Sequence, residues 1–222
     1  MTENLFDDSY EEEPDYCPKM YSQDEIGILE DHIFDYFGEF DNVFHEIVSP
    51  DIHVDIAVIE PTPERNYYTL ITMGMGAHRM NVPEELSDLN FDRAELMICL
   101  PPDWDVKSSE ENRYWPIRWL KIMARLPLNH ETWLGWGHTV PTGEPIESTD
   151  FECLLVVSPG DFDDNGFECE IPDGSLINFY QLIPLYAEEM AYKLENGTEA
   201  LLELMTDDAL RYVKVDRESV CE

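Results

Sequence analysis

Basic residues are scarce in this sequence. Its 222 residues include 13 lysines and arginines against 49 aspartates and glutamates, which gives a formal net charge of −36 at pH 7. A chain this acidic is repelled by phosphate backbones and by anionic membrane surfaces, so nucleic acids and membranes are unfavourable partners. A basic protein would be attracted, and its association accelerated. The same charge also favours solubility, and composition alone leaves both roles of the acidity open.

Long apolar runs are also absent. None approaches the ~18 residues that a membrane-spanning helix requires. The first residues, MTENLFDDSYEEEPDY, are acidic where a signal peptide has a basic start and an apolar centre. The sequence therefore predicts a soluble, cytoplasmic protein. A hydrophobic content of 43%, with 12% aromatic residues, suffices for one substantial core.

The distribution of apolar residues predicts the domain organisation. Residues 1–20 are acidic with few apolar anchors and predict a mobile arm. Residues 207–222 are polar and predict a frayed tail. Between them, residues 21–206 show no internal repeat and no interdomain linker, and we expect a single domain. The sequence gives no indication of the oligomeric state.

Cysteines are few and widely spaced, and no C-x-x-C pair occurs among the five. An odd number without close pairs favours free thiols in a reducing compartment over a disulfide framework or a zinc site. These cysteines are Cys17, Cys99, Cys153, Cys169 and Cys221.

Recognisable catalytic motifs are missing: there is no G-x-S-x-G, no S-x-x-K and no H-E-x-x-H. His53 and Asp55 stand two positions apart in a predicted strand, so their side chains face the same side. They could hold a metal ion or a proton with His78 or His138 as a third group, or they could simply form a polar sheet face. We assign no catalytic, cofactor or metal-binding residue.

The glycine pair in TMGMGAHRM (72–80) resembles part of a phosphate-binding loop. The third glycine and the downstream acid of a dinucleotide site are missing. Gly74 and Gly76 are better explained as a bulge or turn where a strand ends.

Helical spacing predicts four helices. Ser22 and Glu25 form a capping box for a helix at 22–37, which can end at Gly38. A second helix at 112–129 opens near Pro116. Its buried face is expected to hold Trp115, Trp119, Ile122 or Met123, and Leu126. A third helix is predicted at 178–197, capped by Asn178, with Pro184 near its first turns and an end at Gly197; Thr198 caps a short fourth helix at 199–205.

Alternating and β-branched segments predict strands. Segments 52–60 and 66–74 form a hairpin, and 93–101 and 151–159 form further strands. Segment 160–175 is predicted to be a turn-rich acidic loop. Strands that occur in pairs between helices, without a βαβ repeat, predict an α+β fold: a mixed or antiparallel sheet with flanking helices.

The segment TWLGWGHTVPTGEP (132–145) contains two tryptophans, a histidine and three glycines. A structural turn that packs against the second helix is favoured over a binding pocket. Exposed tryptophans would be good anchors for a protein partner, and acids of the 160–175 loop could receive a basic one. The partner-binding candidates are Trp133, Trp136, His138, Asp161, Asp163 and Asp164.

Several long motifs occur in an order that resembles a known family. They are HVDIAVIEPTPERNYYTLITMGMGAHRMNVPEEL, RAELMICLPPDW, YWPIRWLKIMARLP, TWLGWGHTVPTGEP and FYQLIPLYAEEMAYKLENG. Together they are similar to the Suppressor of fused (SUFU-like) domain of the bacterial single-domain type, over roughly residues 30–205.

This resemblance implies a compact α+β fold and action by binding, without catalytic residues or a cofactor. Animal members sequester Gli transcription factors with the help of a further C-terminal domain, which this sequence is expected to lack, so Gli recognition is not transferred. Bacterial relatives are described as immunity proteins, which implies a protein partner here, such as a basic toxin. An uncharacterised enzyme or metal-binding protein using His53 and Asp55, and a general acidic scaffold or DNA mimic, are the alternatives.

Overall fold

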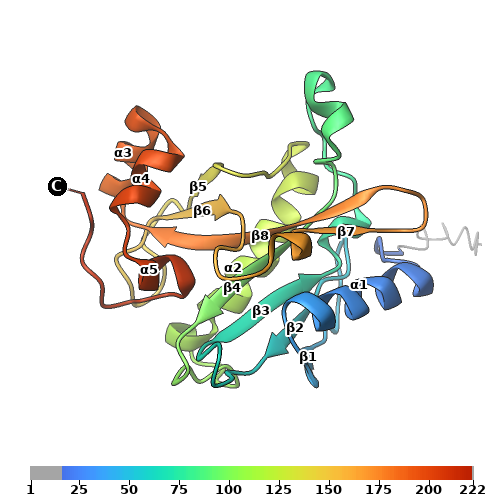
Figure 1. The fold of residues 1–222 in the computed structure, drawn as a ribbon, viewed down its shortest axis with the longest axis horizontal. Helices are drawn as coiled ribbons and strands as arrows, with labels where there is room; N and C mark the ends of the chain where they lie inside the picture. Colours follow the sequence, from blue (N-terminus) through green and yellow to red (C-terminus); the bar gives the residue numbers. More distant parts are fainter. Residues whose placement is uncertain (1–16, 222) are drawn as a thin grey trace, which may run out of the picture.

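One eight-stranded sheet organises the protein. The computed structural model describes residues 17–221, so the arm predicted at 1–20 lies almost wholly outside the described residues (Figure 1). The strand order is β1-β2-β3-β4-β8-β6-β5, and β7 also pairs with β8. All paired strands are antiparallel except β4 and β8, which run parallel. The predicted α+β class, a mixed sheet with flanking helices, is confirmed.

The strands come from the whole length of the described chain. They are β1 (Asn42–Phe44), β2 (Asp55–Ile59), β3 (Tyr68–Met73), β4 (Ala94–Leu100), β5 (Thr139–Pro141), β6 (Cys153–Val157), β7 (Glu168–Glu170) and β8 (Leu176–Leu185). The predicted hairpin is present, with Ala57 of β2 opposite Ile71 of β3.

Five α-helices and three short 3₁₀ segments complete the described fold. The helices are α1 (Gln23–Tyr36), α2 (Glu111–His130), α3 (Ala187–Asn196), α4 (Thr198–Leu204) and α5 (Asp207–Arg211), and the 3₁₀ segments are η1 (Met75–Ala77), η2 (Glu84–Leu89) and η3 (Asp164–Gly166). The capping box of Ser22 and Glu25 is present at α1. Helix α2 begins five residues before Pro116, at Glu111, which corrects its predicted start.

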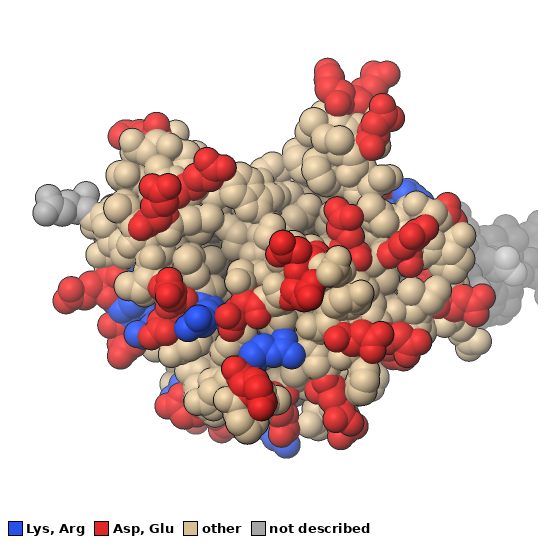
Figure 2. Space-filling model, viewed as in Figure 1, with Lys and Arg blue, Asp and Glu red and all other residues tan. Residues whose placement is uncertain are grey.

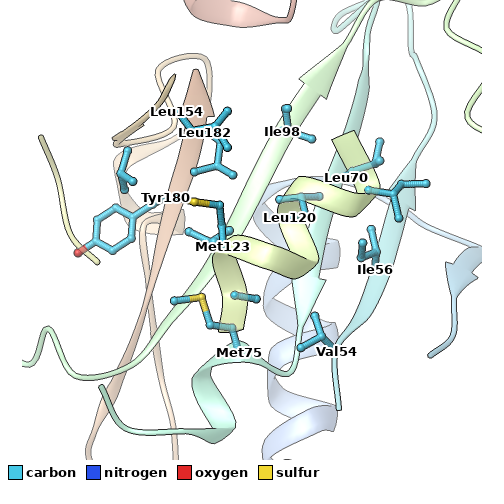
Figure 3. Close-up of a cluster of buried hydrophobic side chains, with 14 of the residues drawn as sticks. Val54, Ile56, Leu70, Met75, Ile98, Leu120, Met123, Leu154, Tyr180 and Leu182 are labelled. Carbon is cyan, nitrogen blue, oxygen red and sulfur yellow. The ribbon is translucent and has the colours of Figure 1, made fainter. Parts of the chain in front are cut away.

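The helices cover the two faces of the sheet unequally. Helix α2 alone covers one face, where Leu120 and Met123 pack against Ile98 and Leu182 (Figure 3). Met123 is therefore the buried alternative, since Ile122 is 43% exposed. Helix α1 covers the other face over β2, β3 and β8. Further along the same face, residues of α4 and α5 pack on β6 and the end of β8.

The predicted helix at 178–197 is wrong in its first half. Residues 176–185 form β8, the longest strand, and α3 begins only at Ala187. Strand β8 lies between β4 and β6, and both its faces are covered. Its sequence is therefore a nearly continuous apolar run. Periodicity alone cannot distinguish such a run from a buried helix. Asn178 donates to the carbonyls of Asn90 and Arg93 instead of capping a helix.

Two expectations for the C-terminal third also need correction. The acidic segment 160–175 contains η3 and the strand β7, so it is only partly a loop. After residue 206 the described chain forms α5 and stays on the domain, where Val213 is buried and Arg217 pairs with the buried Glu189. Gly197 ends α3 as predicted and is also the cap of α4, of which Thr198 is the first residue. The arm at 1–20 and the domain bounds of 21–206 remain predictions.

A pair of glycine variants tests the close packing at the end of β3. Gly74 has φ +143°, and a Cβ there would lie 1.9 Å from the His53 carbonyl oxygen. We expect Gly74→Ala to lower the free energy of unfolding by about 3 kcal/mol or more, from backbone strain and overpacking. Gly27→Ala is the matched control, because Gly27 lies inside α1 with no atom within 4 Å of an added Cβ. It should raise stability by about 0.5–1 kcal/mol in urea unfolding; equal effects of the two variants would contradict this packing.

Candidate functional site

The glycine segment after β3 binds a carboxylate of the protein itself. Backbone N–H groups of Gly74 and Gly76 donate to Oε1 of Glu95 at 2.9 and 3.1 Å, and that of Met75 donates to Oε2 at 3.3 Å. The hydroxyls of Tyr21 and Thr72 donate to the same carboxylate at 2.6 and 2.5 Å. The donors that could have held a phosphate are therefore occupied, and the glycines mark a turn at the strand end, as predicted.

Glu95 lies on β4 and is completely buried. The pKa of Glu95 is raised, because burial outweighs the side-chain and backbone hydrogen bonds that favour the ionised form. Beside it, the guanidinium of Arg93 donates to the Gly76 carbonyl at 2.6 Å and to the carboxylate of Glu25 at 2.8 Å. This cluster joins β3, β4 and the start of α1, so its role is to position these elements.

His53 and Asp55 do lie together, with 3.0 Å between Nε2 of His53 and Oδ1 of Asp55. The second carboxylate oxygen contacts Nδ1 of His45 at 2.8 Å. Neither proposed third group makes a contact with this pair: His78 contacts Lys19, and His138 packs on Trp133. Within residues 17–221, no three His, Cys, Asp or Glu side chains are grouped so that they could hold a metal ion.

A serine extends this pair into a Ser–His–Asp line that the sequence did not indicate. The hydroxyl of Ser49 lies 2.8 Å from Nδ1 of His53 and also 2.8 Å from Oε2 of Glu46. Two backbone groups add to these contacts: the N–H of Glu46 donates to Asp55, and that of Val54 donates to Glu46. Together these hydrogen bonds brace the loop of residues 45–50.

Glu46 anchors the same loop to α2. Arg125 of α2 donates to both its carboxylate oxygens at 2.8 and 2.7 Å and to Asp51 at 2.8 Å. The pKa of Glu46 is lowered: burial acts to raise it, but the Val54 N–H, the Ser49 hydroxyl and the Arg125 charge outweigh burial. At the tip of the braced loop Ile47 is 96% exposed.

The WLGWGH segment lies over an open cavity of about 330 Å³ between the end of α2, β5 and α3. The Trp133 ring stacks on Phe91 at 6.0 Å and meets the His138 ring edge-on at 4.4 Å. Burial lowers the pKa of His138, and the nearby charge of Lys193 lowers it further. Trp133 is half-buried as the predicted structural turn requires, whereas Trp136 is 45% exposed.

The three acidic candidates lie in another part of the structure. Asp161 accepts from the Tyr67 hydroxyl at 2.8 Å and pairs with Arg211 at 3.3 Å, so it contacts α5 and the residue that precedes β3. Asp163 caps η3, and Asp164 is exposed in that segment. Sequence reasoning missed Phe91 and Lys193, which flank Trp133 and His138 in space. No local signal could have found them, because they belong to distant segments.

The surface around these residues is strongly acidic. Carboxylates are spread over the face seen in Figure 2, with basic residues in few places. Most arginines are held in ion pairs with the protein's own acids. Those in such pairs are Arg79, Arg93, Arg118, Arg125, Arg211 and Arg217. No helix of the described chain is long and apolar enough to cross a membrane.

Substitution of Glu95 tests the buried carboxylate. In Glu95→Gln an amide nitrogen replaces an oxygen that accepts hydrogen bonds, and we expect a loss of about 3 kcal/mol in the free energy of unfolding. Glu168→Gln is the control, because Glu168 is exposed on β7, and its effect should stay within about 0.5 kcal/mol. Equal effects in urea unfolding would contradict a structural role for the Glu95 carboxylate.

Glu46 gives a pH-dependent prediction. Its folded-state pKa is lowered, so its stabilising effect is complete above the unfolded-state pKa, about 4.3, and is lost as the pH falls through the folded-state value. Glu46→Gln should therefore be less stable than the wild type by about 2 kcal/mol at pH 7, and the difference should shrink below about pH 4. Urea unfolding at several pH values measures this. A difference that stays constant would contradict it, and the exposed Glu39→Gln should follow the wild type throughout.

Comparison with solved structures shows where this fold occurs. A chain of the Sufu–Fu complex superimposes with a TM-score of 0.64 at 16% identity, over 92% of this chain and 93% of that one. A SUFU homologue of Neisseria gonorrhoeae FA 1090 superimposes with a TM-score of 0.58 at 18% identity. The match covers 90% of this chain and 97% of the homologue. Drosophila Suppressor of Fused superimposes with a TM-score of 0.57 at 15% identity, over 91% of this chain and 52% of the fly chain.

Sequence comparison gives the same assignment. An uncharacterized protein of Ureaplasma parvum serovar 3 is 29% identical over 203 residues, which cover 90% of this chain and 96% of the relative. The family model described as Suppressor of fused protein (SUFU) matches residues 50–218, which is most of the chain. The chain therefore belongs to the Suppressor of fused protein family.

Proposed function

We propose that this chain is a protein-binding module without catalysis of its own, and that it acts in the cytoplasm as an immunity protein against a bacterial toxin. The observation that carries the proposal is Trp136 on a strongly acidic molecule: it is a 45% exposed tryptophan, next in sequence to Gly137, which lines an open cavity. Exposed aromatic residues are typical anchors of protein interfaces. Most arginines are paired with the protein's own acids, and the remaining excess of carboxylates gives an acidic exterior that suits a basic toxin.

The relatives support binding as the mode of action. A structural neighbour was crystallised as part of a Sufu–Fu complex, so a protein of this fold takes a protein partner. The toxin as the partner rests on the charge of this chain and on its resemblance to bacterial members. Trp133, Trp136 and His138 are the proposed contact residues; Asp161 is less suited, because its carboxylate is already paired with Arg211.

An enzyme that uses His53 and Asp55 is the second candidate, because Ser49, His53 and Asp55 are aligned. His53→Ala separates the two functions: an enzyme would lose its activity, whereas a binding module would keep its partner. A general acidic scaffold or DNA mimic would compete with duplex DNA for many basic proteins, whereas an immunity protein would bind one toxin.

The first test measures binding to the product of a toxin-like gene next to the gene for this chain. We expect association to slow at least about tenfold between about 50 and 500 mM NaCl, because screening removes charge steering, while dissociation changes less. Trp136→Ala should instead speed dissociation, and His53→Ala should change neither rate. Surface plasmon resonance separates the two rates, and co-expression tests protection from the toxin. Association that is insensitive to salt would rule out the charge argument, and absence of binding with no protection would rule out the toxin.

A further inference from the structure

The WLGWGH segment forms the floor of a notch between two projecting walls. We define the floor as residues 132–140, the first wall as residues 84–91 and the second wall as residues 187–204. Phe91 of the first wall stacks on Trp133 of the floor. On the other side, Lys193 lines the floor cavity and Thr198 lies 3.0 Å from the Cβ position of Gly137. Figure 2 shows the hollow between the two walls, which Figure 1 identifies as η2 and the α3–α4 pair.

Charge is distributed unequally over the notch. In Figure 2 the projecting ends of both walls are red and the hollow between them is largely uncharged. The exposed acids of the walls that line no other cavity are Glu84, Glu85, Asp88, Glu199 and Glu203; Glu188 and Glu195 of α3 line a separate cavity with Val220 and Cys221. The floor cavity is lined mainly by apolar and aromatic residues, among them Leu126, Trp133, Leu134 and Val140. Lys193 is the one charged residue in that lining.

We infer that the notch takes a basic amphipathic segment of the partner protein, with apolar side chains on the floor and lysines or arginines against both walls. This inference rests on the proposed function and names the surface and the chemistry of the partner. An apolar side chain placed on Trp136 and in the floor cavity loses contact with water. Basic residues on either side of it then meet carboxylates at the rim.

The floor and the walls each exclude another kind of partner. Lys193 disfavours a cationic side chain at the floor, so a merely basic peptide makes only the wall contacts. The wall carboxylates repel an acidic peptide, and they also repel the equally acidic walls of a second copy of this chain. Only a segment that combines an apolar centre with basic flanks satisfies both parts of the notch.

The experiment uses short fluorescein-labelled peptides of equal length and the full chain. One peptide has a leucine-rich centre between lysine flanks. A second replaces its leucines with serine, and a third replaces its lysines with glutamate. Fluorescence anisotropy at physiological salt should show at least about tenfold tighter binding of the first peptide than of either other peptide. Tighter binding of the acidic peptide, or equal binding of the first two, would overturn the inference.

Matched charge variants separate the notch from the overall charge. The wall variant combines Glu84→Gln, Glu85→Gln and Asp88→Asn. The control combines Glu39→Gln, Glu64→Gln and Asp41→Asn, which removes the same charge from exposed residues near the β1–β3 edge of the sheet, opposite to β5. The wall variant should weaken binding of the first peptide about tenfold and the control about twofold or less. Equal losses would assign the effect to net charge and overturn the inference.

Trp136→Ala tests the floor. It should weaken binding of the leucine-rich peptide about tenfold and leave the serine peptide unchanged. Circular dichroism and thermal melts confirm that each variant is folded. Self-association that depends on Trp136, measured by sedimentation, would assign the floor to a second copy and contradict the inference.

If the toxin binds but the wall variant has no effect on it, the notch is wrong and the proposed function stands. If the peptide preferences hold and no toxin binds, the toxin proposal fails and the notch stands.

Discussion

The carboxylate of Glu95, buried inside the sheet, is the contact on which the arrangement of the N-terminal half depends. A buried charge without partners would cost several kcal/mol, so the surrounding chain must supply donors. It does so from three places: the turn after β3, Thr72 within β3 and Tyr21 ahead of α1. The turn can approach closely because Gly74 has no side chain. A Cβ at this position would collide with the His53 carbonyl. One carboxylate thus fixes where a strand ends, where the next one lies and where the first helix begins.

The same device recurs in two other places. Glu46 holds the 45–50 loop to α2 through Arg125, and the fully buried Glu189 holds the C-terminal segment through Arg217. In a chain with 13 basic residues, these contacts commit arginines to internal pairs. The acidity of the exterior is therefore partly a consequence of how the fold is held together. The internal arginine pairs and the acidic exterior therefore both follow from the small number of basic residues in the chain.

Local patterns predicted the elements whose determinants are local. Helix α1 has a capping box and an apolar stripe, and the β2–β3 hairpin has alternating strands around a proline-containing turn. Strand β8 could not be recognised, because its burial on both faces depends on β4 and β6, which are distant in sequence. At the site, the WLGWGH segment was recognisable from its aromatic residues and glycines. Its neighbours Phe91 and Lys193 are brought there only by the tertiary fold.

Rigid support of the floor is what makes the notch suitable for binding. Trp133 is fixed between Phe91 and His138, so little side-chain entropy remains to be lost there when a partner binds. Trp136, two residues after the Leu134 that anchors the segment in the core, is held facing solvent at little further cost. The wall carboxylates act over a longer range and influence the rate of encounter, whereas the floor influences how long a bound segment stays. A surface divided in this way selects a partner by two independent properties, its charge and its apolar centre, and needs no chemical step to do so.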